Sequence, residues 1–242
     1  MAFFTAGCLA GKVAIVTGAS GGIGRAVVAA MSAAGASTVA TDIVASGSSE
    51  NDALFLEHDV TNPGHWRQIV EQCTERFGYP SVLVNCAGIF IPSPIMKETV
   101  EGFLKTTQIN QIGVFLGMQA VHDAMAKAGG GSIVNLSSAA GMGGNADTLA
   151  YTASKFAVRG MSKVAAIEFA PAGIRVNSIH PAAVRTSMIS GAIEGNSRAG
   201  ERTLLKRIME PEEVANMVVF LASDASSYST GSEFICDGGM RA

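Results

Sequence analysis

The sequence predicts an α/β fold, a single-domain, doubly wound parallel sheet of about seven strands with helices on both faces. Three observations support this prediction. Short β-branched segments alternate with longer helical segments along the 242 residues. A glycine-rich turn joins the first predicted strand to the first predicted helix, as in nucleotide-binding sheets. The chain has no internal repeat and no long linker, so we expect one domain over residues 1–242.

The composition favours a protein that acts on a small molecule. The chain is 48% hydrophobic, carries a net charge of −3 and has no run of Lys or Arg, which argues against nucleic acid or a membrane surface as partner. Its four cysteines are scattered, so we expect neither a disulfide framework nor a metal site. Residues 1–8 lack the cationic start of a signal peptide, and no apolar run could span a membrane. We therefore expect a cytoplasmic protein.

The first strand and helix form a candidate dinucleotide site. Residues 12–17 are predicted as a buried strand, and a helical stretch follows at 25–34. Between them, Gly18, Gly22 and Gly24 would let the backbone approach a pyrophosphate, whose charge would then lie at the helix N-terminus. The alternative is a plain glycine loop.

A carboxylate follows the second predicted strand. Residues 37–41 end on Asp42, which lies 24 residues after Gly18. An acidic group at this place accepts hydrogen bonds from the adenosine ribose and repels a 2′-phosphate, which favours NAD over NADP. The alternative is a solvated aspartate. Residues 43–52 have no helical periodicity and are predicted as a loop.

The rest of the chain continues the alternation. Strands are predicted at 53–57, 81–85, 132–136, 175–179 and 233–236, and helices at 61–77, about 100–128 and 212–222. A further helix bears Tyr151 and Lys155 and is predicted to continue to about residue 170. Trp66 is interpreted as a packing residue. Asn110 is unfavourable inside a helix, so it either faces solvent or is retained by a specific contact. Residues 185–209 have broken periodicity and are predicted as a lid over a pocket, with a surface excursion as the alternative.

Tyr151 and Lys155 are the strongest candidates for chemistry. They are four residues apart in a predicted helix and therefore share one face. A free tyrosine has a pKa of about 10, and a fixed cation nearby lowers that value. We therefore expect Lys155 to make Tyr151 a usable acid or base. Taken alone, the pair also fits a solvated helix face.

Together these motifs make the chain resemble the classical short-chain dehydrogenases/reductases from Lys12 to Gly239. The resemblance rests on motifs that occur in order: Thr17-Gly18-x-x-x-Gly22-x-Gly24, Asp59-Val60, Asn85-x-Ala87-Gly88, Asn110, Ser138, Tyr151-x-x-x-Lys155 and the segment 177–186. It implies a Rossmann fold and a homotetramer in which the helices of Asn110 and Tyr151 pack between subunits.

The resemblance also implies roles for individual residues. Tyr151 would be the acid/base, Lys155 would lower its pKa and bind the nicotinamide ribose, and Ser138 would hydrogen-bond the reacting oxygen, with Ser137 structural. Asn110 would hold a water that links Lys155 to solvent. The cofactor contacts would be Gly18, Ser20, Gly22, Ile23 and Gly24 at the diphosphate, Asp42 at the adenosine ribose, Asp59 and Val60 at the adenine, Asn85, Ala87 and Gly88 along the dinucleotide, and Pro181, Val184 and Thr186 at the nicotinamide.

The chain departs from the family pattern in three places. Cys86 stands where the family often has a second asparagine. Ala182 replaces the usual glycine after Pro181, so the loop that carries Val184 is expected to be stiffer or shifted. The crossover at 43–52 is short and lacks the usual helix. None of these departures removes a catalytic group.

The resemblance implies reversible hydride transfer between NAD and the carbinol carbon of a secondary alcohol. The expected pocket residues are mostly apolar, and only Arg185 among the cations is placed to hold an anion, so we expect an uncharged alicyclic, aromatic or steroid-like substrate. The substrate contacts predicted beside Ser138 and Tyr151 are Met142, Leu149, Ala183 and Met188, with Ile89, Phe90, Ala139 and Ile189 as further pocket residues. Two alternatives are an NADPH-dependent 3-oxoacyl reductase of the same family and a non-catalytic dinucleotide-binding sensor.

Overall fold

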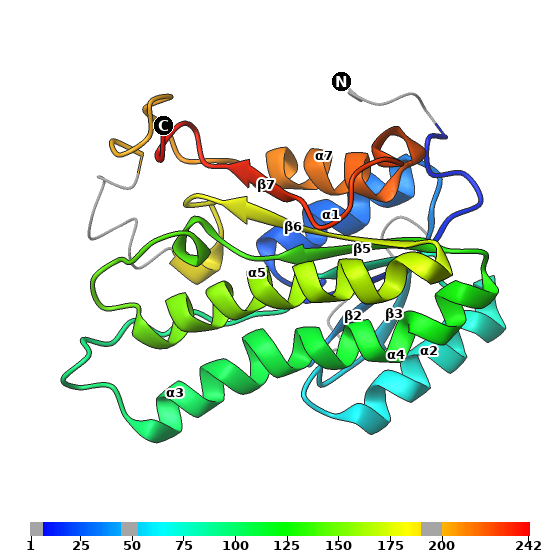
Figure 1. Ribbon diagram of the computed structural model, residues 1–242, viewed down its shortest axis with the longest axis horizontal. Helices are drawn as coiled ribbons and strands as arrows, with labels where there is room; N and C mark the ends of the chain where they lie inside the picture. The colour runs from blue at the N-terminus through cyan, green and yellow to red at the C-terminus, as the bar shows by residue number, and fades with distance from the viewer. Residues whose placement is uncertain (1–6, 45–52, 190–199) are drawn as a thin grey trace.

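A parallel sheet organises the computed structural model, which describes residues 7–44, 53–189 and 200–242 (Figure 1). In these residues the sheet has seven strands in the order β3-β2-β1-β4-β5-β6-β7, so the predicted fold class is confirmed. The strands are β1 (Val13–Thr17), β2 (Ser37–Asp42), β3 (Leu54–Glu57), β4 (Val82–Asn85), β5 (Gly131–Leu136), β6 (Ile174–Pro181) and β7 (Glu233–Cys236). The strand order reverses between β1 and β4, the place where parallel sheets of this kind bind ligands.

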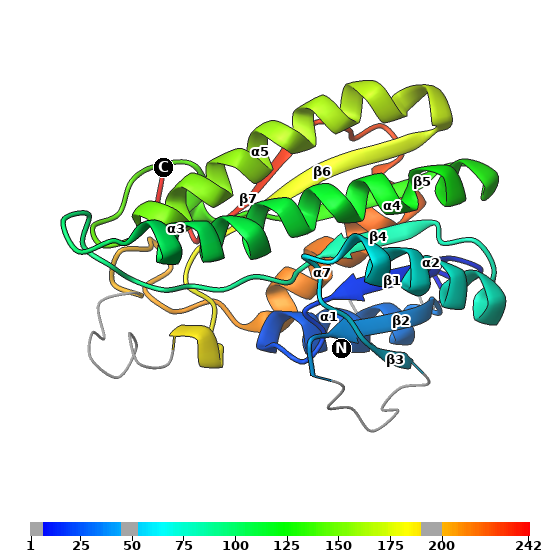
Figure 2. The ribbon, with the colours of Figure 1, turned by 90° about the horizontal axis from the view of Figure 1, so that it is seen from below.

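Helices cover both faces of the sheet. Helices α1 (Gly22–Ala33) and α7 (Pro211–Ala222) lie on one face, and α2 (Pro63–Phe77), α4 (Gly113–Lys127) and α5 (Leu149–Phe169) lie on the other (Figures 1 and 2). Adjacent residues of β1 belong to different cores, because side chains alternate across a strand. Val16 packs with Val27 in the first core, and Ile15 packs with Trp66 in the second. Burial on both faces explains the continuous apolar runs of the strands.

The long helix predicted over 100–128 is divided. It consists of α3 (Val100–Thr107), a π-helical turn at Gln108–Ile112, and α4. Asn110 lies in the π-helical turn and is fully buried, so a specific contact and not solvent retains it. The first helix begins at Gly22, three residues before the predicted start, because the glycines of the turn already take helical geometry.

The N-terminus of α2 is capped by a side chain. The side chain of Asn62 accepts hydrogen bonds from the backbone amides of Gly64 and His65, and Pro63 occupies the first helical position. Trp66 is 1% exposed and its indole N–H donates to the carbonyl of Val60 at 2.9 Å. Its interpretation as a packing residue is therefore confirmed, and its hydrogen bond also fixes Val60.

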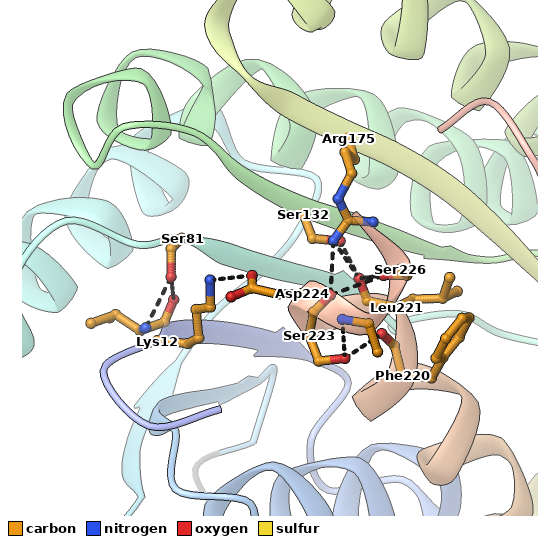
Figure 3. A network of polar contacts seen from close by, with 11 residues as sticks. Lys12, Ser81, Ser132, Arg175, Phe220, Leu221, Ser223, Asp224 and Ser226 are labelled. Carbon is orange, nitrogen blue, oxygen red and sulfur yellow. Dashed lines mark hydrogen bonds and ion pairs between the residues drawn. The ribbon is translucent and has the colours of Figure 1, made fainter. Parts of the chain in front are cut away.

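A polar network closes the amino end of the sheet (Figure 3). Lys12 Nζ pairs with Asp224 Oδ1 at 2.8 Å. The guanidinium of Arg175 and the hydroxyl of Ser132 both donate to the carbonyl of Leu221, at 2.9 Å and 2.7 Å. These donors satisfy a carbonyl that the last turn of α7 leaves unpaired, and they fix α7 on the sheet.

Two predicted segments are described only in part. The predicted loop at 43–52 is described to residue 44, and the predicted lid at 185–209 is described at 185–189 and 200–209; the remaining residues of both lie outside the described chain. In the lid, residues Ser187–Ile189 form one 3-10 turn. No helix of the described chain has the length and apolar character needed to cross a membrane.

Candidate active site

Two adjoining cavities lie at the carboxyl ends of the strands. The larger, of about 890 Å³, extends from the glycine turn past Asp42 to Gly88. The smaller, of about 450 Å³, is lined by Ser138, Tyr151 and Lys155. Both cavities share the wall residues Ile23, Cys86, Gly88, Phe90, Thr186 and Met188. A ligand that fills the larger cavity therefore reaches the edge of the smaller one.

The glycine turn is packed so closely that two positions require glycine. Gly18 has a φ of +66°, and a Cβ there would lie 2.7 Å from Ala87 Cα. At Gly24 a Cβ would overlap the backbone carbonyl oxygen of Gly18. The N-cap of α1 is Gly21, whose lack of a side chain leaves the first amides of the helix to an anion. The turn therefore fits the diphosphate of a dinucleotide.

Asp42 ends β2 at the larger cavity, as predicted. Its Oδ2 accepts from the amide of Ser20 at 2.9 Å, and its Oδ1 accepts from the amide of Ile43 at 2.7 Å. These two backbone donors fix the carboxylate and leave further lone pairs for hydroxyl donors. The arrangement fits a ribose diol better than a 2′-phosphate, which would meet a fixed negative charge.

The cavity floor beyond Asp42 contains a histidine that the sequence analysis did not select. His58 is buried, its Nδ1 lies 2.9 Å from Thr41 Oγ1, and its ring meets the Trp66 ring edge-on at 4.3 Å. Burial lowers the pKa of His58 to about 4, so the ring is neutral at pH 7. Next to it, Asp59 accepts from the amide and hydroxyl of Thr61, which lowers the pKa of Asp59.

Tyr151, Lys155 and Ser138 meet at the smaller cavity. The first two lie on successive turns of α5, and Ser138 follows β5. Lys155 Nζ lies 5.6 Å from the centre of the Tyr151 ring and donates to the carbonyl of Leu136 at 2.8 Å. The Tyr151 ring packs edge-on against Phe90 at 5.0 Å. The helical spacing thus brings phenol and ammonium to one wall, as predicted.

The pKa values of this cluster are shifted by burial. Burial raises the pKa of Tyr151, and a hydrogen bond with Ser138 acts in the opposite direction. Burial also lowers the pKa of Lys155, to about 8. Withdrawal of the phenol from water therefore outweighs the hydrogen bond with Ser138, and the pKa of Tyr151 in the protein without cofactor lies above its ordinary value. The lowering of that pKa by Lys155 stays a prediction.

Asn110 connects the π-helical turn to the cavity wall. Its Oδ1 accepts from the amide of Ile89 at 2.8 Å, and its Nδ2 donates to the carbonyl of Ile89 at 2.9 Å and to Ser154 Oγ at 3.2 Å. A Cβ at Gly88 would lie 3.3 Å from Asn110 Oδ1 and 3.7 Å from Lys155 Nζ. Asn110 and Lys155 therefore approach the same backbone position.

The segment that carries Ser138 is held from several sides. Ser137 Oγ donates to the carbonyl of Lys155 at 2.9 Å, a contact that joins this segment to α5. His180 Nδ1 lies 3.3 Å from the Ser138 carbonyl oxygen. Arg241, near the end of the chain, donates to the carbonyl of Ala139 at 2.6 Å. Neither His180 nor Arg241 was selected from the sequence.

Comparison with known proteins identifies the family. A family model described as enoyl-(acyl carrier protein) reductase matches residues 18–241. The crystal structure of a short-chain type dehydrogenase/reductase from Mycobacterium marinum matches with a TM-score of 0.91 and 34% identity over 96% of each chain. This chain belongs to the short-chain dehydrogenase/reductase family. Members of this family are oxidoreductases that use nicotinamide dinucleotides, and the two cavities fit that use.

Two further relatives of this short-chain dehydrogenase/reductase are named after ring alcohols. The 3-alpha-(or 20-beta)-hydroxysteroid dehydrogenase of Mycobacterium bovis is 44% identical over 239 residues, which cover 96% of this chain and 90% of that protein. The trans-4-hydroxycyclohexanecarboxylate dehydrogenase of Sinomonas cyclohexanicum is 38% identical over 249 residues, covering 97% of this chain and 94% of that protein.

Most cofactor residues implied by the family pattern line the two cavities. The larger one is lined by Gly18, Gly22, Ile23, Gly24, Asp42, Asp59, Val60, Ala87, Gly88 and Thr186, and the smaller one by Tyr151, Lys155, Pro181 and Val184. Asn85 and Ser20 are outside both sets of lining residues. Asn85 is buried and its amide donates to Asn135 Oδ1 at 2.8 Å, so its side chain joins β4 to β5.

The departures from the family pattern leave these residues in place. Cys86 lines both cavities, its amide donates to Thr17 Oγ1 at 3.1 Å, and burial raises the pKa of its thiol to about 12. The amide of Ala182 donates to the carbonyl of Cys236 at 3.0 Å. Pro181 and Val184 still reach the wall of the smaller cavity.

Most of the predicted substrate residues line the smaller cavity, and the others do not. Ser138, Tyr151, Ala183 and Met188 line the smaller cavity, together with Phe90, Ala139 and Ile189. Ile89 lines the larger cavity. Met142 and Leu149 are not among the lining residues of either cavity; Leu149 is the first residue of α5 and is 39% exposed.

The structure changes the assignment of the cation near the substrate. Arg185 Nε donates to Glu210 Oε1 at 2.9 Å, and Arg185 lines neither cavity. Arg202, Asn145 and Met240 line the smaller cavity instead. Arg202 and Met240 are far from Tyr151 in sequence, Asn145 precedes it by six residues, and no motif marked any of the three.

Proposed function

We propose that this chain is an NAD-dependent dehydrogenase that interconverts a secondary alcohol and its ketone on an alicyclic, aromatic or steroid-like skeleton. The proposal rests on the cavity in which Ser138, Tyr151 and Lys155 adjoin the glycine-turn cavity. Apolar walls around the tyrosine, including Phe90 and Val184, fit a hydrocarbon ring that is uncharged near the reacting carbon. The names of the hydroxysteroid and hydroxycyclohexanecarboxylate dehydrogenases support a ring alcohol.

The choice of NAD rests on Asp42. Its carboxylate is fixed by two backbone amides at the larger cavity, where it would accept hydrogen bonds from the adenosine ribose. A 2′-phosphate at that ribose would bring about two negative charges close to the carboxylate. The NADPH-dependent 3-oxoacyl reductase is the alternative that this charge disfavours.

In the proposed reaction the hydride and the proton of the alcohol are transferred to different groups. When bound, the nicotinamide ring accepts the hydride from the carbinol carbon and returns it in the reverse direction. Tyr151 exchanges the hydroxyl proton, and Ser138, which is hydrogen-bonded to Tyr151, donates to the reacting oxygen. Because burial raises its pKa, Tyr151 is protonated in the free protein and suited to donate to a ketone.

Lys155 and Asn110 complete this proposal. The Lys155 ammonium lies 5.6 Å from the centre of the Tyr151 ring, so it favours the phenolate when an alcohol is oxidised. We assign ribose binding to its Nζ and assign Asn110 to a water that carries the proton onward. The close approach of both groups to Gly88 supports this path.

Exposed apolar side chains support the proposal that four subunits assemble through α4 and α5. Phe115 on α4 is 44% exposed, and Val164 and Ile167 on α5 are 54% and 77% exposed. Apolar groups that gather on helix faces are typical of subunit interfaces. These are the helices that, by the family resemblance, would pack between the subunits of a homotetramer.

Substitution of Tyr151 tests the proposed function. Tyr151→Phe should reduce turnover of a ring alcohol with NAD by at least about a thousandfold, because the acid/base is lost. Binding of NADH, followed by its fluorescence, should be unchanged. Tyr79→Phe is the matched control, since Tyr79 is exposed and contacts Lys127. Retained turnover in Tyr151→Phe would refute the assignment.

Initial rates discriminate between the remaining alternatives. Faster oxidation with NAD than with NADP supports the role of Asp42, and the reverse preference together with reduction of 3-oxoacyl thioesters supports the 3-oxoacyl reductase. Binding of NADH without turnover across a panel of ring alcohols and ketones supports the sensor.

A further inference from the structure

The charges that line the smaller cavity are unbalanced. Of its described lining residues, Lys155 and Arg202 carry positive charge, and none is Asp or Glu. The proposed function assigns Lys155 to the cofactor ribose and to the phenol of Tyr151. Arg202 then remains as a positive charge that no lining carboxylate balances.

The guanidinium of Arg202 makes only a weak polar contact within the described part of the protein. Its Nη1 donates to Asn145 Oδ1 at 3.5 Å, the long limit for a hydrogen bond, and no ion pair to it occurs in the described part of the chain. Arg207 on the same segment differs, because both of its Nη atoms lie 2.7 Å from the carboxylate oxygens of Glu213. Most N–H groups of Arg202 are therefore free to bind a ligand.

The turn that carries Arg202 is fixed against the rest of the fold. Thr203 is buried, and its hydroxyl donates to the carbonyl of Gly200 at 2.9 Å. The amide of Leu204 donates to the carbonyl of Gly238 at 2.8 Å, which ties this turn to the segment after β7. The cavity wall at Arg202 is thus presented by ordered backbone, which reduces the entropic cost of binding.

We propose that the substrate carries a carboxylate on its ring skeleton, remote from the carbinol carbon, and that Arg202 and Asn145 bind it. This proposal rests on the function proposed above. A guanidinium offers two parallel N–H donors to a carboxylate, and the Asn145 amide adds a third donor because its Oδ1 already faces Arg202. A single unbalanced cation matches a monoanion. This substrate differs from the uncharged one expected from the sequence: its ring is apolar at Tyr151 and anionic at its far end.

Matched acids and esters test this proposal. Alicyclic, aromatic and steroid hydroxy acids would each be assayed with NAD beside their methyl esters, starting with trans-4-hydroxycyclohexanecarboxylate. The wild-type enzyme should prefer at least one acid by about tenfold or more in kcat/KM, the range expected for a charge-assisted hydrogen-bonded pair. Arg202→Gln should remove the preference mainly by raising KM, and Arg202→Lys should retain part of it.

The control is Arg185→Gln, since Arg185 pairs with Glu210 and lines neither cavity; it should keep the acid preference. Equal rates for acid and ester in the wild type, or an unchanged preference in Arg202→Gln, would overturn the proposal while leaving the proposed function intact. Oxidation of no ring alcohol of either kind would instead refute the proposed function. Calorimetric binding of cyclohexanecarboxylate to the NADH complex gives a readout without turnover: binding lost in Arg202→Gln supports the carboxylate site, and binding unaffected by that substitution contradicts it.

Discussion

Replacing Lys155 by methionine should stabilise the free protein at neutral pH, although it removes activity. Lys155 is 5% exposed, and burial lowers its pKa from 10.5 to about 8. Keeping that buried amine protonated costs the folded state about 3 kcal/mol relative to the unfolded chain. Methionine avoids this cost but leaves the Leu136 carbonyl without its donor at 2.8 Å, a loss of about 1 kcal/mol. The variant should therefore gain about 2 kcal/mol at pH 7.

The advantage of the variant should disappear as the pH rises. Below pH 8 the amine is protonated in both states, so the wild type carries the full cost. Between about pH 8 and 10.5 the folded protein has released a proton that the unfolded chain still binds, so wild-type stability increases with pH. Near pH 10.5 only the lost hydrogen bond remains, and the variant should be the less stable by about 1 kcal/mol. The difference between the two proteins thus changes sign.

Urea unfolding at pH 7 and pH 10.5, at one protein concentration and without cofactor, measures this difference. The buried Trp66 is the sole tryptophan and reports unfolding by fluorescence. Cys73 and Cys86, whose pKa values burial raises to about 12, also titrate on unfolding at high pH. Loss of the Lys155 charge raises the pKa of Cys86 further, so both folded proteins keep these thiols protonated at pH 10.5 and the thiol contributions nearly cancel. Lys97→Met, at an exposed lysine, should show no sign change. A Lys155→Met variant less stable than wild type at pH 7 would refute the reasoning.

Two other substitutions test neighbouring features. Gly143→Ala should lower kcat/KM by about tenfold without changing NADH binding. The new Cβ would lie 2.5 Å from Arg241 Nη1 and would displace the guanidinium that donates to the Ala139 carbonyl beside Ser138. Steady-state kinetics and NADH titration measure the two effects. Glu233→Gln should lower stability at pH 7 by about 1 kcal/mol. Since the Arg159 and Lys163 cations lower the Glu233 pKa to about 2, this loss should shrink as the pH falls from 4.5 toward 2 in urea titrations.

The strands and the cofactor end of the site could be predicted because their signals are local. The β-branched runs mark the parallel strands, and Gly18 and Gly24 are required by backbone contacts that only glycine permits. The helical spacing of Tyr151 and Lys155 is equally local, and the structure places both on one cavity wall. A single parallel sheet follows from such patterns because short right-handed crossovers place successive strands beside one another.

The substrate end could not be predicted, because its residues come together only in the folded chain. Arg202, Asn145 and Met240 reach one cavity from three separate loops, and nothing in their neighbours distinguishes them from surface residues. Arg185 looked suitable from its position, but Glu210 binds it. A charge on a loop acquires a role only through the partners that tertiary structure provides or withholds.

The direction of the Tyr151 pKa shift could not be predicted for a related reason, and it bears on the roles proposed for the site. A helical spacing specifies that a cation is near a phenol, but not how far both are withdrawn from water. Burial here raises the pKa of Tyr151 and lowers that of Lys155 to about 8, so the phenol holds its proton firmly while the amine exchanges its own near neutral pH. Such a pair suits a relay in which Tyr151 transfers a proton to the substrate and Lys155 restores it from solvent through Asn110. The opposite shifts produced by one buried site therefore support the proposed division of roles better than the lowered tyrosine pKa that the spacing predicted.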